Sequence, residues 1–218
     1  MRSLPIAASL ILLGACNMVT TKTPLFGPAD AIGAPQLRPG VWRGDSDHPC
    51  AFDEAGPLAR WPDCANALVV QDGVLSFHNV NPRTVSTTPF VLAGSSPSVL
   101  QAAGDEADAK AASGSADDRG YFYMGLRPTK TDPQGRILAF TAWSTMCGPP
   151  PPSDAKSTDG QHARYGSLTP LPGLTMDKDE NNCTTSSKDA VRAAAAASEK
   201  WTKPDSIVGA HWVRDGDR

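Results

Sequence analysis

The chain has 218 residues and a formal net charge of −3, from 20 lysines and arginines against 23 aspartates and glutamates. The basic residues are not clustered, so the sequence gives no indication of a surface for nucleic acids or anionic lipids. The length suits one ordinary domain. The 20 prolines and 19 glycines indicate that this domain is rich in loops.

Residues 1–15 have the layout of a secretory signal peptide. Arg2 supplies a positive charge, an apolar run covers residues 4–13, and two small residues follow. The run is too short to cross a bilayer as a helix. The tetrapeptide Leu13-Gly14-Ala15-Cys16 resembles the lipobox of bacterial lipoproteins. This resemblance implies cleavage before Cys16, a diacylglycerol on its thiol and a fatty acyl chain such as palmitate on its new amine. The alternative is an ordinary signal peptide.

Asn17 directly follows the cysteine that the lipobox would lipidate. It resembles the second residue of lipoproteins sent to the outer membrane, because the inner-membrane retention signal of enteric bacteria is an aspartate there. We therefore expect a lipid-anchored protein of the bacterial cell envelope, in the outer rather than the inner membrane. The membrane would be a partner through the lipid on Cys16.

Four cysteines remain after Cys16, namely Cys50, Cys64, Cys147 and Cys183. An even number in an oxidising compartment indicates two disulfides, which three different pairings would satisfy. We favour pairing between sequence neighbours, Cys50 with Cys64 and Cys147 with Cys183. Such bonds would contribute roughly 3 and 4 kcal/mol in the chain-entropy model. A zinc site is not favoured, because the chain has no CxxC pair, and no metal or cofactor is expected.

Residues 16–37 are predicted to be the lipidated cysteine and a flexible tether. The segment carries few charges, contains Pro24, Pro28 and Pro35, and shows neither helical nor alternating periodicity. Fully extended it would reach on the order of 70 Å. The folded domain is expected to cover residues 38–218.

The clearest local pattern in this domain is Asp72-Gly73 between two apolar runs. It predicts a two-residue hairpin of strands 67–71 and 74–78, with Val70 opposite Leu75 and Leu68 opposite Phe77. Further strands are expected at 89–93, 98–102, 121–127, 136–146, 168–176 and 207–213. The strand at 136–146 is apolar on both faces, which is typical of a central strand.

One helix is expected at about residues 186–203. Ser186 and Asp189 form a start like a capping box, and Pro204 ends the helix. An apolar stripe through Val191 and Ala194 would pack on a sheet. The sequence therefore predicts an α+β fold, namely a loop-rich, disulfide-stapled, mostly antiparallel sheet of about six to nine strands with this helix packed on it.

Two short matches resemble a catalytic family. Gly44-Asp45-Ser46 resembles the opening block of GDSL-type hydrolases, and Asp159 and His162 have that family's Asp-x-x-His spacing. The resemblance implies Ser46 as nucleophile, His162 as base and Asp159 as its orienting carboxylate. However, the chain lacks the family's Gly-x-Asn-Asp block and its helices. An enzyme is therefore not favoured, and no catalytic residue is assigned.

Trp61 is the candidate for a binding surface, since it lies inside the predicted Cys50–Cys64 loop beside Pro62. A stapled loop that displays a tryptophan would suit recognition. We therefore expect a lipid-anchored, periplasm-facing envelope lipoprotein whose non-catalytic domain binds an envelope protein or a glycan, or has a structural role. The alternative is a lipid-anchored envelope hydrolase that uses Ser46 and His162.

Overall fold

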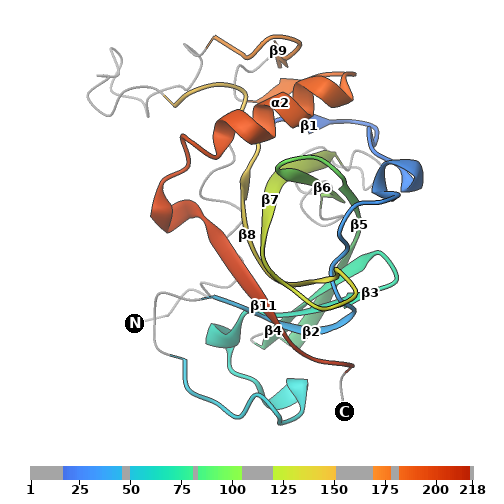
Figure 1. The fold of residues 1–218 in the computed structure, drawn as a ribbon. Helices are drawn as coiled ribbons and strands as arrows, with labels where there is room; N and C mark the ends of the chain where they lie inside the picture. Colours follow the sequence, from blue (N-terminus) through green and yellow to red (C-terminus); the bar gives the residue numbers. More distant parts are fainter. Residues whose placement is uncertain are drawn as a thin grey trace, which may run out of the picture.

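The computed structural model describes residues 17–45, 50–80, 83–104, 120–150, 169–177 and 182–216. Eight strands form a closed antiparallel barrel, in which each strand pairs with the next along the chain and the last pairs with the first (Figure 1). They are β2 (Gly40–Gly44), β3 (Ala67–Gln71), β4 (Val74–Val80), β5 (Arg83–Ala93), β6 (Ser98–Ala103), β7 (Tyr121–Thr131), β8 (Ile137–Ser144) and β11 (Val208–Arg214). The predicted mostly antiparallel sheet is thus confirmed, and closure into a barrel leaves these strands without a free edge.

The hairpin of β3 and β4 forms as predicted. Asp72 and Gly73 both have positive φ, 49° and 75°, which a type I′ turn requires. Leu68 faces Phe77 and Val70 faces Leu75, the predicted register. These four side chains point into the barrel and belong to its central core.

The barrel interior is filled by large apolar side chains. An eight-stranded barrel is just wide enough for inward side chains to fill it. Two aromatic rings in it, Trp42 and Phe140, lie 5.6 Å apart at their centroids. The buried residues of this core are Leu37, Trp42, Leu68, Val70, Leu75, Leu92, Leu100, Ala102, Leu126, Ile137, Phe140, Ala142 and Ala210.

Two covers lie on opposite outer sides of the barrel (Figure 1). The first, over β6, β7 and β8, contains α2 (Lys188–Ser198), the short strands β1 (Thr20–Thr21), β9 (Thr175–Met176) and β10 (Cys183–Thr184), and the short 3₁₀ helix η2 (Pro28–Ala31). The second is the segment 50–66, with the 3₁₀ helices η3 (Leu58–Arg60) and η4 (Asp63–Ala65), over the outer face of β2 and β3. A further 3₁₀ helix, η7 (Pro204–Ser206), precedes β11.

The predicted C-terminal helix is present but shorter than the range 186–203. Its N-cap is Ser187, whose hydroxyl accepts from the backbone N–H of Ala190; the predicted cap, Ser186, lies one residue earlier. Val191 and Ala194 are buried as predicted, and alanines at the contact allow the helix axis to approach the sheet closely. Gly125 allows a second close approach, because a Cβ there would lie 2.5 Å from the Trp143 ring.

The prediction of a flexible tether at 16–37 is wrong for the residues that the structure describes, 17–37. β1 pairs with β7, with Thr20 opposite Phe122. Val19 and Phe26 are buried in the first cover, and Leu37 is buried in the barrel core. The segment lacks periodicity because it contains only the short elements β1 and η2 and is held by contacts with segments distant in sequence. The folded unit therefore takes in residue 17 onward, not 38 onward.

Candidate functional site

Both predicted disulfides are confirmed. Cys50 and Cys64 have Cα atoms 5.8 Å apart, and Cys147 and Cys183 have Cα atoms 5.7 Å apart, with sulfur atoms bonded in each pair. Each cover of the barrel contains one of the two bonds. The sequence candidates Cys16, Ser46, Asp159 and His162 lie outside the described residues.

The prediction that Trp61 is displayed for binding is wrong. Its side chain is only 2% exposed, and its ring lies 4.8 Å from that of Phe52. The indole N–H donates to the carbonyl of Gly56, and the Arg214 guanidinium lies 5.3 Å from the ring. The reason is that β2 and β3 are also apolar on their outer face, through Val41 among others, so the stapled segment turns its apolar side chains inward to cover that face.

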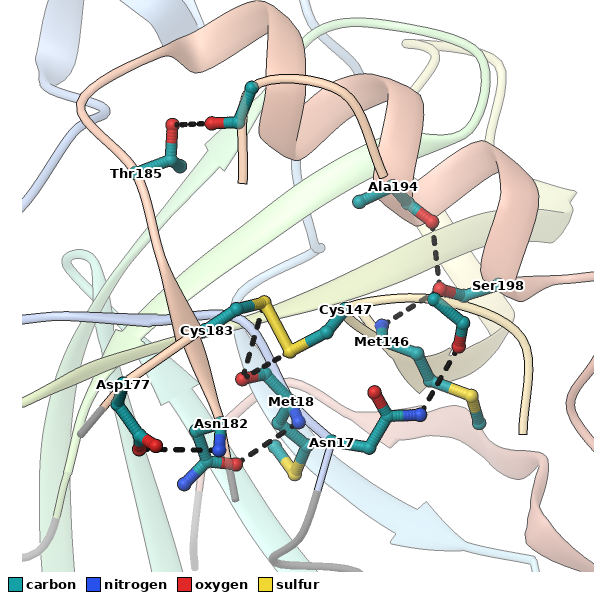
Figure 2. Close-up of a disulfide and its surroundings, with 12 residues drawn as sticks. Asn17, Met18, Met146, Cys147, Asp177, Asn182, Cys183, Thr185, Ala194 and Ser198 are labelled. Carbon is teal, nitrogen blue, oxygen red and sulfur yellow. Dashed lines mark hydrogen bonds between the residues drawn. A yellow bond between two sulfur atoms is a disulfide. The ribbon is translucent and has the colours of Figure 1, made fainter. Parts of the chain in front are cut away.

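A connected group of hydrogen bonds surrounds the first residues that the structure describes, Asn17 and Met18. We call it the anchor clamp, and it consists of Asn17, Met18, Cys147, Asn182 and Cys183 (Figure 2). The Met18 N–H donates to the Asn182 side-chain oxygen at 3.1 Å, and the Met18 carbonyl accepts from the Cys183 N–H at 3.1 Å. The Cys147 N–H donates to the Asn17 carbonyl at 2.9 Å. Three segments that are distant in sequence therefore meet at residues 17 and 18.

Asn17 suits this position in two ways. Its φ is 74°, in the left-handed region that asparagine tolerates better than most residues. Its side-chain amide donates to the Gly148 carbonyl at 3.1 Å. The residue is only 3% exposed, and both its carbonyl and its side-chain amide are hydrogen-bonded.

Two further side chains bind the clamp to its surroundings. The Asp177 carboxylate accepts from the Asn182 N–H at 3.2 Å. This hydrogen bond orients Asn182, whose side-chain oxygen accepts from the Met18 N–H. On the other side, the Ser198 hydroxyl donates to the Ala194 carbonyl and accepts from the Met146 N–H (Figure 2). Because Met146 is bridged to Met18, the end of α2 is connected to the clamp through one hydroxyl.

Beyond the clamp, the chain stays attached to the barrel wall. The buried hydroxyls of Thr21 and Tyr123 lie 2.5 Å apart, and burial raises the pKa of Tyr123 above its usual value. The buried Gln101 amide uses both ends: its oxygen accepts from the Leu25 and Phe26 N–H groups, and its nitrogen donates to the Phe26 carbonyl. A barrel-wall side chain thus pairs with backbone that would otherwise lie buried without partners.

An ion pair then ties η2 to α2. Lys188 donates to both oxygens of Asp30, at 2.9 and 2.7 Å, and Arg192 lies 3.8 Å from the same carboxylate. The hydrogen bond from Lys188, with a further one from the Gly27 backbone, lowers the pKa of Asp30. Both basic side chains also lie over the Phe26 ring, at 6.0 and 5.2 Å. The N-terminal segment is therefore held by charge as well as by packing.

The described residues offer little that resembles a reaction centre. No group of three or more histidine, cysteine or acidic side chains among them could hold a metal ion. Asp45 pairs with His211 at 3.1 Å, in an exposed position. A shallow depression of about 340 Å³ is lined by Ala55 and residues 212–215; beside it, Arg38 stacks on Trp212 and pairs with Asp215.

Sequence reasoning missed the clamp because its polar residues, Asn17 and Asn182, lie in no linear motif. The sequence did contain an indication that this segment is buried: Val19 and the pair Leu25-Phe26 are bulky apolar side chains that a free tether would expose.

Within the described part of the chain, no helix is long and apolar enough to cross a membrane. No protein-family model, no curated protein and no solved structure matches this chain.

Proposed function

We propose that this chain is an exported bacterial lipoprotein, anchored in the cell envelope by lipid on Cys16, with a non-catalytic barrel domain that has a binding or structural role. One observation carries the first half. The sequence has five cysteines, and the two disulfides use Cys50, Cys64, Cys147 and Cys183. Cys16 alone is left over, and it is the residue that the lipobox resemblance marks for lipidation. Disulfides are typical of exported proteins.

The packed interior supports the second half of the proposal. Catalysis needs ionisable or nucleophilic groups around a water-poor pocket, whereas the barrel interior is occupied by apolar side chains such as Trp42 and Phe140. The wall formed by β4 and β5 carries Val85, which is exposed, and the half-exposed Ser76 and His78. These side chains form a surface of mixed polarity.

The hydrolase remains the second candidate, because Asp45 orients His211 and the residue after Asp45 is Ser46. A histidine held by a carboxylate is one element of a nucleophilic site. The proposal predicts that Ser46→Ala, His162→Ala and His211→Ala leave the cellular role intact. Loss of that role in any of these variants, with normal folding and localisation, would favour the hydrolase.

Metabolic labelling tests the anchor directly. Cells that express the protein and are grown with a labelled fatty acid should yield a labelled band of this protein on a gel. The substitution Cys16→Ser should abolish that label. The matched control is the double variant Cys50→Ser with Cys64→Ser, which removes two cysteines but keeps the lipid acceptor, so its label should persist. Label on the Cys16→Ser protein would reject the proposed anchor. Fractionation with the inner membrane would reject only the outer-membrane assignment, which depends on Asn17.

A further inference from the structure

The anchor clamp leaves no free length of chain between the proposed lipid and the domain. Consecutive Cα atoms lie about 3.8 Å apart, so a lipid on Cys16 emerges within one residue of Asn17. Asn17 is 3% exposed, and its carbonyl and side chain are both hydrogen-bonded to residues 147 and 148. The attachment point is thus part of a rigid body rather than the end of a tether.

Partly exposed apolar side chains lie on the chain segments that are connected to this attachment point. Met18 and Met146 are bridge partners and are both half-buried. Ser198 connects them to the end of α2, where the Trp201 N–H donates to the Ser198 carbonyl at 3.0 Å and the Trp201 side chain is half-buried. We call this surface the anchor face; its residues are Met18, Met146, Trp201, Ile207 and Val208.

Ile207 and Val208 extend the anchor face along the barrel rim. They are 36% and 38% exposed, and Val208 pairs with Ala142, four residues before Met146 on the same chain segment. In Figure 1 the segment after α2 leads down beside β8 into β11. Lys200 and Lys203 are exposed and flank Trp201, with Asp205 exposed nearby.

We propose that the domain lies directly on the bilayer that holds its lipid, with the anchor face against the lipid headgroups. The inference rests on the proposed lipidation of Cys16. Tryptophan favours the membrane–water interface, and lysine side chains can extend to headgroups while their stems cover apolar surface. A face this small would bind lipid weakly by itself. The anchor removes that difficulty, because a surface held within a few ångströms of the bilayer meets it at a high effective concentration.

Quenching of tryptophan fluorescence by brominated lipids tests this arrangement. The lipidated protein is reconstituted in vesicles of phosphatidylethanolamine and phosphatidylglycerol that contain phosphatidylcholine brominated near the top of its chains. Trp201 should be quenched, so Trp201→Phe should reduce the quenched amplitude by more than about twofold. The matched control is Trp212→Phe, because this tryptophan is also partly exposed but lies toward the other end of β11 from Val208, stacked on Arg38. The Trp212→Phe substitution should leave the quenched amplitude unchanged.

A second variant keeps the test independent of the Trp201 substitution. Insertion of about twelve glycine and serine residues between Cys16 and Asn17 gives an average reach of about 20 Å. The domain should then leave the surface for much of the time, and the quenching should fall. The inference would be overturned if protein that floats with vesicles, and whose mass shows the lipid, were quenched equally with and without Trp201. It would also be overturned if such protein showed no quenching at all. Protein that carries no lipid would instead reject the proposed function.

Discussion

Phe26→Ala tests whether the N-terminal segment belongs to the fold. The Phe26 side chain is 2% exposed and makes an edge-on contact with Tyr123, with 6.1 Å between ring centroids. Loss of a buried phenylalanine costs about 3–5 kcal/mol through transfer and cavity terms. If the segment were a flexible tether, the same substitution would leave the free energy of unfolding unchanged. We therefore expect the free energy of unfolding to fall by about 3 kcal/mol or more.

The assay is urea unfolding of the mature chain with Cys16→Ser and both disulfides intact, followed by tryptophan fluorescence. The matched control is Ile32→Ala in the same segment, whose side chain is 83% exposed; it should change stability by less than about 0.5 kcal/mol. If Phe26→Ala unfolds at the same urea concentration as the unsubstituted chain, the reasoning about this segment fails.

Three further predictions concern the covers and the barrel wall. Mild reductant should open Cys50–Cys64 before Cys147–Cys183, because Cys64 is exposed and the latter two are fully buried; mass mapping after alkylation shows the order, and simultaneous opening would contradict it. Gly125→Ala should cost about 1–3 kcal/mol, since the new Cβ would collide with the Trp143 ring; unchanged urea unfolding would show that the ring can move away. The Arg127 hydrogen bond lowers the pKa of Glu199, so this pair stabilises the fold above the usual glutamate value near 4.5 and ceases to do so as pH falls through the lowered value. Glu199→Gln should therefore weaken the protein at neutral pH but not in strong acid, and an equal loss at both would refute the assignment.

Local patterns in the sequence were sufficient to predict the hairpin of β3 and β4 and its register. The turn dipeptide Asp72-Gly73 fixes the pairing of its neighbours, because a two-residue type I′ turn allows only one alignment. The helix was also predicted from its apolar stripe, although it ends at Ser198 and not at residue 203. Its start was placed one residue early because Ser186 and Ser187 are both capable caps, and only the backbone geometry decides between them.

Closure of the barrel could not be derived from the sequence. The hairpin of β7 and β8 is local and follows from the strands expected at 121–127 and 136–146. The barrel is closed by β11, which pairs with β2 and β8, strands that are distant in sequence and share no motif with it. The same holds for the N-terminal segment, since a proline-containing stretch with few charges is typical of a linker. Its burial depends on Gln101 and α2, which lie far away in sequence.

The burial of Trp61 follows from the apolar pattern of the neighbouring strand β3. Leu68 and Val70 lie on one face of β3, whereas Ala67 and Val69 are apolar on the other. A strand that is apolar on both faces needs a cover on its outer side, and the adjacent stapled segment was the nearest candidate. Its tryptophan was therefore more suited to packing than to display.

The mass of the mature N-terminal peptide tests the central claim most directly. Protein extracted from membranes is alkylated without reduction, digested and analysed by mass spectrometry. We predict a peptide that begins at Cys16, carries a diacylglycerol and an acyl chain, and continues into Asn17, with no alkylated cysteine elsewhere in the chain. An N-terminal peptide that retains residues 1–15, or an alkylated Cys16 thiol without lipid, would contradict it.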